Sequence, residues 1–459
     1  MSAVQVNTPK IPRKLKFREV FQRWDWLLIV AIAPAMLFPE PRLAWTLLAI
    51  PMVMIVQGFV WRDPNTGAGL LPVTPLNPAI LLLEFMVGVS IFVTPDLAGS
   101  LGKIAGLLFG LAVYFCAARH TRTQQGWRGS LILMIMSSIG IGLLGLVGTN
   151  WYSAKFGGLQ NLTSSLTARI GGLPGAETGI HPNELAGVLL WMIPVILLAG
   201  LALVSEPSWF TGKPESGKFQ FTQFSGWTIL LITASLLSLA LLVLTQSRGS
   251  YLAIGITSLV LFILILRGAA RWWAIGLVAV DALAGAFLIW QFGLQTIMSQ
   301  LVNSLSMSDP LSLVNSMVGR VEIWSRAVWA IRDVPLTGLG MNVFRGGVSV
   351  LYPTFHIASG YDIAHAHNEL LQAALDLGLP GLAGFMALYM GASAMLVPSI
   401  RSKGVWRYLA LGLLGGLLAH FIFGITDAVA LGAKPGFLFW WLLGMVFGLY
   451  DQNRMVKVE

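Results

Sequence analysis

The sequence HAHNELLQAALDLGLPG, residues 365–381, closes a polar stretch that begins near Gln295 and contains no apolar run long enough to cross a membrane. Two of the six histidines stand here, and three arginines precede them at Arg320, Arg326 and Arg332. Elsewhere the chain is poor in charge. This concentration of polar groups predicts that the rest of the chain is a membrane scaffold that holds the stretch on one side.

The composition is typical of a membrane protein. Of the 459 residues, 56% are hydrophobic and only 11% are charged, whereas soluble domains carry about 25% charged residues. Many apolar runs approach about 20 residues, the length that crosses the hydrocarbon core of a bilayer. The net charge of +9 falls largely in short loops, so it indicates topology, and no nucleic-acid partner is expected. The single cysteine, Cys116, lies in an apolar run, which excludes a disulfide framework.

These runs predict an all-α polytopic membrane protein with about twelve transmembrane helices. The predicted helices occupy residues 26–40, 43–61, 77–94, 98–118, 129–148, 185–204, 227–246, 250–266, 273–293, 382–398, 407–428 and 435–450. The chain then divides into a basic N-terminus (1–25), helices one to nine (26–293), a large loop (294–381), helices ten to twelve (382–450) and a short tail (451–459).

The distribution of Lys and Arg predicts the orientation. With the N-terminus inside, the inner segments hold 19 of the 29 basic residues, as the positive-inside rule requires. Both termini are then cytoplasmic, and the loop 149–184, the turn Thr245–Gly249 and the loop 294–381 share the outer face. No small-residue cleavage site follows the first apolar run, so no cleavable signal peptide is expected. The inner loops contain no glycine-rich phosphate motif, and no cofactor is expected.

The large loop is predicted to contain a helix over residues 318–331. Apolar side chains recur at Val321, Trp324, Val328 and Ile331, which is the spacing of a helical stripe. Such a helix is expected to lie at the bilayer surface, with Trp324 and Trp329 near the lipid headgroups.

A turn and a broken helix are predicted to follow. The segment Pro335–Gly340 is rich in turn residues. Gly378 followed by Pro380 is a helix-stop signal. We therefore expect a short outer helix over about 366–377, a break, and the next membrane span from 382.

Three arginines at the predicted outer face are candidate anion ligands. Arg248 stands at the end of a span, where a guanidinium is costly in lipid unless it faces water or an anion. Its small neighbours leave room for a phosphate, which Arg binds with a planar fork. The alternative is a snorkelling side chain that anchors the span. Arg320 and Arg326 on the surface helix bind either a pyrophosphate or lipid headgroups, and their spacing does not decide between the two.

His365 and His367 are candidates for acid–base chemistry. His-x-His without a carboxylate or cysteine at ligand spacing is a weak metal signal, so no metal is expected. A neutral imidazole near outer-face arginines can act as a general base on a hydroxyl, and Glu369 can orient it or neutralise an arginine. The alternative is a polar helix start in which Asn368 and Glu369 are first-turn residues.

Other polar residues lie close to span ends. His181-Pro182-Asn183-Glu184 begins span six at the same face, where His181 and Asn183 can bond to a sugar. The alternative is a helix start with Pro at its first position and an acid in its first turn. Ionisable groups within spans are further candidates, and these are Glu84, His420 and Asp427.

Four of these segments form a pattern: Thr245–Gly249 at a span end, Gly319-Arg320 with Trp324, the turn Pro335–Gly340, and His365–Asn368. Together they resemble the O-antigen ligase/polymerase family of bacterial membrane glycosyltransferases. The ligase pattern is His-Asn/Ser/Gln, nine residues, then Gly-x-x-Gly. Here His367-Asn368 is followed by nine residues, 369–377, and then by Gly378–Gly381. The resemblance is strongest over residues 240–400 and is closer to the ligases.

The resemblance implies a metal-independent C-type glycosyltransferase (GT-C) fold in the bacterial inner membrane, with the large loop in the periplasm. Members of the family take a glycan from undecaprenyl diphosphate. Ligases pass it to a sugar hydroxyl of lipid A–core, and polymerases pass it to another lipid-linked repeat unit. Carried over by motif, Arg248 and Arg320 would hold the diphosphate and His367 would activate the acceptor hydroxyl, with inversion at the anomeric carbon.

The remaining candidates are assigned to substrate binding, and they are His365, Asn368, Glu369, Arg326, His181 and Asn183. Two alternatives to a ligase stay open: a polymerase of the same family, and a polysaccharide or lipid transporter. A transporter is expected to carry ionisable groups near the bilayer midplane and to show repeats between its halves. Here the polar groups gather at one face.

Overall fold

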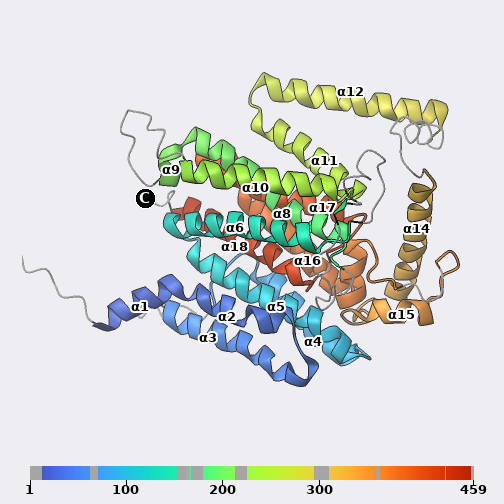
Figure 1. The fold of residues 1–459 in the computed structure, drawn as a ribbon, viewed down its shortest axis with the longest axis horizontal. Coiled ribbons are helices and arrows are strands. Elements are labelled where there is room, and N and C mark those ends of the chain that lie inside the picture. Colours follow the sequence, from blue (N-terminus) through green and yellow to red (C-terminus); the bar gives the residue numbers. More distant parts are fainter. Residues whose placement is uncertain are drawn as a thin grey trace, which may run out of the picture.

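The computed structural model describes residues 13–62, 71–151, 163, 165–166, 179–211, 225–293, 310–357, 362–429 and 431–455. Within these ranges the chain is a bundle of helices (Figure 1), and the only β-type pairing is an isolated bridge between Thr149 and Ile180. The predicted all-α architecture is confirmed for this part of the chain. Residues 294–309 and most of the predicted loop 149–184 lie outside the described ranges.

The helices follow the apolar runs of the sequence. Those of the first half are α1 (Arg13–Trp24), α2 (Trp26–Leu37), the short 3-10 helix η1 (Pro41–Leu48), α3 (Ala49–Trp61), α4 (Asn77–Val93), α5 (Leu97–His120), α6 (Gln124–Gly148), α8 (Pro182–Ser205) and α9 (Pro207–Thr211). Those of the second half are α10 (Ser225–Leu244), α11 (Arg248–Ile265), α12 (Ala269–Phe292), α14 (Pro310–Asp333), α15 (Val343–Leu351), α16 (Glu369–Arg401), α17 (Val405–Gly424), η2 (Lys434–Gly436) and α18 (Phe437–Met455).

Several of these helices are long and apolar enough to cross a membrane. Among the described residues there are eight such helices, or nine if the bent pair Arg18–Trp24 and Trp26–Leu37 counts as one span. A shorter apolar helix covers Asn77–Val93. Each of the twelve predicted ranges contains a helix. The chain is therefore a polytopic membrane protein, and the number of twelve spans stays a prediction.

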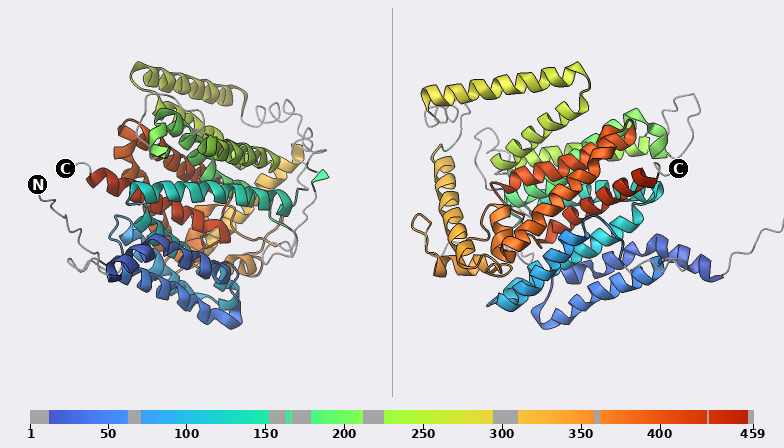
Figure 2. Two further views of the ribbon diagram at one scale, coloured as in Figure 1. Left: turned by 60° about the vertical axis from the view of Figure 1, so that its left-hand side comes forward. Right: turned by 180° about the vertical axis from the view of Figure 1, so that it is seen from behind.

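The bundle has two distinct ends. Figures 1 and 2 place α14 and α15 together at one end, whereas α1, α9 and the C-terminus lie toward the other. We call the first the α14 end. In the interior α17 packs against α8, α18 against α5 and α16 against α4. Large side chains fill the spaces between these pairs, among them the fully buried Trp127, Trp191, Trp440 and Tyr114.

The helix predicted from the stripe in the polar stretch is present as α14, and a face other than the stripe packs against the protein. Val321 is 57% exposed and Val328 is 36% exposed. The buried side chains are instead Ile323, Ala327 and Ala330. They pack in one cluster with residues of α15 and of the segment that leads into α16. The stripe at Val321 and Val328 is therefore an outer face, and its contact with a bilayer surface stays a prediction.

The predicted break in the helix after the histidines is confirmed. α16 begins at Glu369, three residues later than expected, and its backbone leaves the helical region at Gly378, where φ is 68° and ψ is 178°. A Cβ at Gly378 would lie 2.4 Å from the carbonyl oxygen of Leu336. The predicted turn 335–340 thus packs directly on the break, and backbone hydrogen bonds join them from Leu339 N to Leu375 O (2.7 Å) and from Leu379 N to Pro335 O (2.7 Å). Only glycine tolerates both this φ and this close approach.

Candidate functional site

Asp427 lies at the centre of a polar cluster at the α14 end. It follows the C-terminus of α17, and its residue surface is only 4% exposed. Its Oδ1 is 3.0 Å from His367 Nδ1 and 3.9 Å from His365 Nε2. Its Oδ2 is 2.6 Å from Asn183 Nδ2 and 3.5 Å from Arg320 Nη2. Four residues that the sequence marks as candidates therefore meet on one carboxylate.

His367 is held in a defined orientation. A carboxylate only accepts hydrogen bonds, so the 3.0 Å contact with Asp427 places the ring proton of His367 on Nδ1 and leaves Nε2 as the acceptor of the neutral imidazole. The side chain is 28% exposed. The backbone has a φ of 47°, which lies in the left-handed region. For a side chain other than glycine this conformation costs about 1–3 kcal/mol and is concentrated at functional sites.

His365 supports the same segment. Its Nδ1 accepts the backbone N–H of His367 at 3.2 Å, and the two rings lie edge to face with centroids 4.4 Å apart. Trp324 of α14 donates its indole N–H to the carbonyl oxygen of His367 at 3.3 Å. These contacts fix the backbone on both sides of the His367 ring.

A buried amide network connects this segment to α16. The backbone N–H of Ala366 donates to Gln372 Oε1 at 2.8 Å, and Gln372 Nε2 donates to Asp376 Oδ1 at 2.9 Å. Asp376 Oδ1 also accepts the backbone N–H of Asn342 at 3.2 Å. The network positions the histidine segment relative to α16, because Gln372 and Asp376 lie on the first two turns of this helix, which follows the segment.

Three helices begin beside the segment 425–427. Asn183 in the first turn of α8 donates to Asp427. Asn368, which caps α16, donates its side-chain N–H to Ile425 O at 2.9 Å. A Cβ at Gly249, the second residue of α11, would lie 2.8 Å from Thr426 Oγ1. Each helix N-terminus carries a partial charge of about +0.5 and free N–H groups, so the place where the three converge favours anions.

Arg248 adds a formal charge to this region. It is the first residue of α11 and follows the predicted tight turn, in which Gln246 has a φ of 49°. The turn is confirmed, and it joins the ends of α10 and α11. A cation at a helix N-terminus opposes the helix dipole. The Arg248 guanidinium at this position is therefore stabilised most when an anion lies nearby.

The electrostatics of the cluster set its protonation. Burial alone would raise the pKa of Asp427, but the hydrogen bond from His367 and the charges of His367, His365 and Arg320 hold this pKa well below its usual value. Burial, reinforced by His367, lowers the pKa of His365. At neutral pH the site therefore contains an ionised Asp427 and a neutral His365.

Arg326 lies in a network of its own and not on Asp427. Its Nε donates to Pro353 O at 2.8 Å, and its guanidinium stacks over Trp329 with 4.5 Å from Cζ to the ring centroid. The adjacent Glu322 accepts the backbone N–H groups of Phe355, His356 and Ile357 at 2.5, 3.0 and 3.2 Å. Together these two buried residues fasten the loop after α15 to α14. The geometry favours a structural role for Arg326 over the predicted substrate contact.

Glu369 does not orient His367. It is buried, and its Oε2 lies 3.0 Å from Nε2 of His420, whose ring stacks on Trp191 with 3.9 Å between centroids. The expectation that Glu369 orients the histidine or neutralises an arginine is therefore wrong for the described contacts, because the first turn of α16 directs this side chain toward α17. Asp427 occupies the orienting position instead.

Two other candidates act as helix caps. Asn368 Oδ1 accepts the N–H of Leu371 at 2.9 Å, and His181 Nδ1 accepts the N–H of Asn183 at 3.2 Å. The helix-start alternatives for both segments are thus observed. They do not exclude a role in binding, since both caps lie beside the Asp427 cluster.

Among the residues that the structure describes, two groups of side chains bring metal-type ligand atoms together. The first is His365, His367 and Asp427, whose ligand atoms lie within 4.8 Å of one another. Tertiary structure here supplies the carboxylate that is missing at ligand spacing in the sequence. The same carboxylate also bonds to Asn183 and contacts Arg320, and a guanidinium beside it opposes a second cation. The absence of a metal from the reaction stays a prediction.

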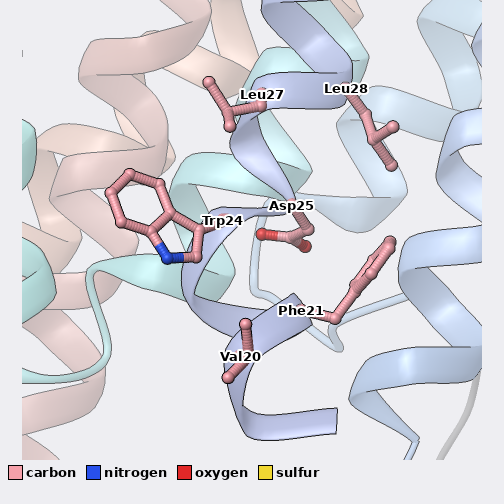
Figure 3. A pocket seen from close by; sticks show the side chains of 6 residues that line it. All are labelled: Val20, Phe21, Trp24, Asp25, Leu27 and Leu28. Carbon is pink, nitrogen blue, oxygen red and sulfur yellow. The ribbon is translucent and has the colours of Figure 1, made fainter. Parts of the chain in front are cut away.

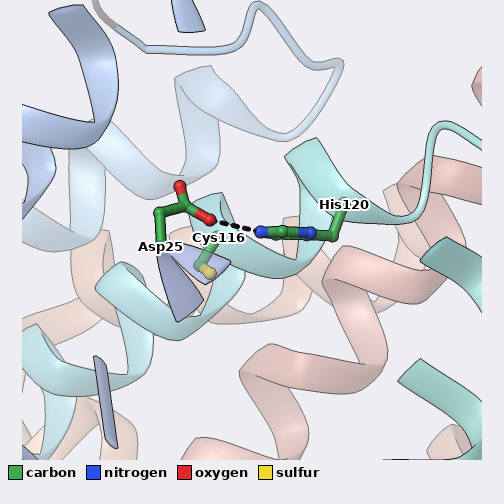
Figure 4. Close-up of side chains that lie close together, drawn as sticks. All are labelled: Asp25, Cys116 and His120. Carbon is green, nitrogen blue, oxygen red and sulfur yellow. Dashed lines mark hydrogen bonds and ion pairs between the residues drawn. The ribbon is translucent and has the colours of Figure 1, made fainter. Parts of the chain in front are cut away.

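The second group lies in the first part of the bundle (Figure 4). It comprises Asp25, Cys116 and His120. Asp25 Oδ1 is 2.5 Å from His120 Nε2, and Asp25 Oδ2 accepts from Trp61 Nε1 at 2.7 Å. Both carboxylate oxygens are therefore engaged in direct hydrogen bonds, which tie the junction of α1 and α2 to α3 and α5.

Asp427 is the central residue that the predicted site lacks. The sequence marks it only as one ionisable group in a span. A further signal was present, because the predicted topology places the end of span eleven at the same face as His367 and Asn183. The contact between Asp427 and His367 could not be predicted from the sequence, because the two residues are 60 residues apart and separated by two helices.

Fold and site define the class of the protein: a helical polytopic membrane protein with a histidine–aspartate pair, arginines and converging helix N-termini at one end of its bundle. Residues 233–386 match the family model for O-antigen ligase, which supports the resemblance over this part of the chain. The match contains Arg248, Arg320, His367 and the glycine motif, and it ends before Asp427. No protein among curated sequences matches the chain.

Proposed function

We propose that the protein is an O-antigen ligase that transfers a glycan from undecaprenyl diphosphate to a sugar hydroxyl of lipid A–core. The observation that carries the proposal is the hydrogen bond from His367 Nδ1 to Asp427, with Arg320 on the other oxygen of the carboxylate. A family model for O-antigen ligase spans both His367 and Arg320. The same support makes the chain a membrane glycosyltransferase of this general type.

His367 serves as the general base. Its Nε2 is the acceptor nitrogen, and the ring is partly exposed, so an acceptor hydroxyl can approach it. As the hydroxyl oxygen bonds to the anomeric carbon, its proton passes to Nε2, and the bond between that carbon and the diphosphate oxygen breaks. Asp427 remains ionised and stabilises the imidazolium, in the manner of the aspartate in a Ser-His-Asp triad. Attack opposite the leaving group gives inversion.

Fixed positive charge stabilises the leaving diphosphate. Arg248 and Arg320 supply the formal charges, and the N-termini of α8, α11 and α16 supply partial charges. Such preorganised groups stabilise charge that develops in the transition state without needing a metal. Arg320 also balances Asp427, so Arg248 is the arginine whose removal reports most directly on the leaving group.

The orientation completes the proposal. The α14 end faces the periplasm, and both termini lie in the cytoplasm of a cell whose inner membrane holds the chain. In this arrangement the lipid tail of the donor stays in the bilayer, while its diphosphate reaches the arginines at the membrane boundary. The basic N-terminal segment and the inner loops support it through the positive-inside rule.

The base assignment is tested with His367→Gly in purified protein supplied with lipid-linked glycan and lipid A–core. Glycine is preferable to alanine because the φ of 47° is strained for alanine. Loss of a general base is expected to lower the rate by about 10²–10⁴-fold, and added imidazole should restore part of it. Asn342→Gly, at another left-handed position that is not occupied by glycine, is the matched control with unchanged rate. Normal turnover by His367→Gly would refute the base.

Arg248→Ala tests the leaving-group assignment against Arg332→Ala, an exposed arginine at the end of α14. We expect only Arg248→Ala to abolish transfer while the protein stays folded and inserted. Omission of lipid A–core separates ligase from polymerase. Chain lengthening without the core acceptor means that the protein is a polymerase, the alternative of the same family.

A further inference from the structure

A large groove opens along the side of the bundle away from the Asp427 cluster. Its volume is about 1010 Å³, and it runs between α2, α5, α6 and the start of α18. The walls are mostly apolar, with Ile29, Leu37, Phe109, Val113 and Phe437 among the lining residues. Such a volume is at the upper end of those of small-molecule sites, and its walls match hydrocarbon chains.

One end of the groove is polar and carries cations. Arg23, Arg128, Gln125 and Glu19 line it there. The guanidinium of Arg128 stacks over Trp209, with 5.1 Å from Cζ to the ring centroid. Its Nε is buried and has no hydrogen-bond partner among the described residues. A buried guanidinium N–H without a partner is costly, and an anionic oxygen bound in the groove would satisfy it.

The junction between α1 and α2 borders the groove. The two helical segments are bent by 41° at this point. Figure 3 shows Asp25 at the junction, between Phe21 and Trp24 on one side and Leu27 and Leu28 on the other. Asp25 is anchored to Trp61 and His120. The bend therefore has a fixed position, and Arg23, which lines the groove, comes just before it in the sequence.

We propose that this groove is a binding site for an anionic glycerophospholipid. The phosphate binds at Arg23 and Arg128, and the acyl chains lie along the apolar wall between α2 and α6. Charge complementarity selects the anionic headgroup, since the charged groups that line this end in the described part of the chain are two arginines and one glutamate. The apolar walls favour a ligand with acyl chains over a free soluble anion. The site is separate from the proposed glycosyl-transfer site, with which it shares no residue.

The test uses the full-length protein in detergent after delipidation. Binding and melting temperature are measured with phosphatidylglycerol, phosphatidylcholine and inorganic phosphate, by native mass spectrometry and thermal unfolding. We expect phosphatidylglycerol to bind and to raise the melting temperature, and the other two to do neither. Arg23→Gln/Arg128→Gln should bind about 30-fold more weakly, because each basic residue at an anionic lipid surface contributes a factor of about five.

A second variant blocks the groove and keeps both arginines. A Cβ at Gly129, which lines the groove, meets no atom within 4 Å, so Gly129→Leu can fold and fill the space. Gly140→Leu is the matched control on the same helix, because its Cβ also meets nothing and the residue does not line the groove. Only Gly129→Leu should lose phosphatidylglycerol.

Four results would overturn the proposal. Equal binding of phosphatidylcholine would remove the anion specificity, and an equal effect of inorganic phosphate would indicate a soluble anion site. Unchanged phosphatidylglycerol binding by Gly129→Leu, or an equal loss of binding in Gly140→Leu, would show that the groove is not the binding site. Should the double arginine variant fail to fold, Arg23→Gln alone serves, since Arg23 is exposed.

Discussion

Asp427→Asn is the substitution that most directly probes the proposed site. The side chain keeps its shape, but one acceptor oxygen becomes a donor. Oδ1 accepts from His367 and from the backbone N–H of Ala428, each at 3.0 Å, and Oδ2 accepts from Asn183 at 2.6 Å. Whichever way the new amide turns, its N–H₂ faces existing donors, so one side of the cluster loses its acceptor.

The size of the effect follows from the bonds that are lost. A hydrogen bond to a charged group contributes about 1.5–3 kcal/mol, which corresponds to a rate about 10- to 150-fold lower if the loss is felt in the transition state. The larger effect arises if the amide N–H₂ faces His367, because the ring proton then moves to Nε2 and removes the base. The equivalent change in the Ser-His-Asp triad lowers kcat by about 10⁴-fold.

The assay is glycan transfer at saturating donor between pH 5 and pH 9, together with thermal unfolding. Because the pKa of Asp427 lies well below its usual value, its charge is present throughout this range, so the defect should not depend on pH. The carboxylate contributes stability above its unfolded pKa of about 3.9 and loses it only at lower pH. Asp362→Asn, in an exposed ion pair with Arg345, is the control with an unchanged rate. A folded Asp427→Asn protein with more than half the wild-type rate would refute the reasoning.

Three further outcomes are expected. Gly378→Ala should lower the free energy of unfolding by about 2–4 kcal/mol, from the left-handed φ and the close backbone contact, whereas Gly88→Ala, whose Cβ meets nothing within 4 Å, should be neutral or stabilising by thermal unfolding. His365→Gln should make the free energy of unfolding depend less on pH in the acid range. The lowered pKa of His365 means that the folded state binds fewer protons than the unfolded state. Wild-type stability therefore falls as the pH drops below about 6.5, by at most about 1.4 kcal/mol per pH unit. Glu369→Gln should lower the free energy of unfolding by about 1–3 kcal/mol, through the loss of its buried pairing with His420, with little change in KM. A raised KM without destabilisation would instead support a role of Glu369 in substrate binding.

Much of the architecture could be predicted from the chain alone. Lipid forces every backbone polar group to be satisfied within a segment, so apolar runs of membrane length become helices wherever they occur. All twelve predicted ranges contain one. Local chemistry also placed the turn at Pro335–Gly340 and the break at Gly378, because proline and glycine restrict or free the backbone regardless of what packs around them.

The sequence did not determine which face of a helix meets which partner. The stripe with Val321 and Val328 predicted the helix α14, but it did not show that Ile323 and Ala327 are the residues that pack inside the protein. Both sets recur at helical spacing, so periodicity predicts a helix. It cannot tell which of two adjacent faces packs against the protein when a different surface covers the other face. Glu369 failed for the same reason: its position in the first turn was right, but its direction depended on α17.

The candidate site was also predictable only in part. The sequence by itself determined the residue types: a histidine segment at a helix start, arginines at a span end and on α14, and glycines at the break. Only the tertiary structure decided that Asp427 joins them, because its carboxylate reaches His367, Asn183 and Arg320 across distances of 60 to 244 residues along the chain. Such pairing depends on how helices pack side by side, and no local spacing encodes it.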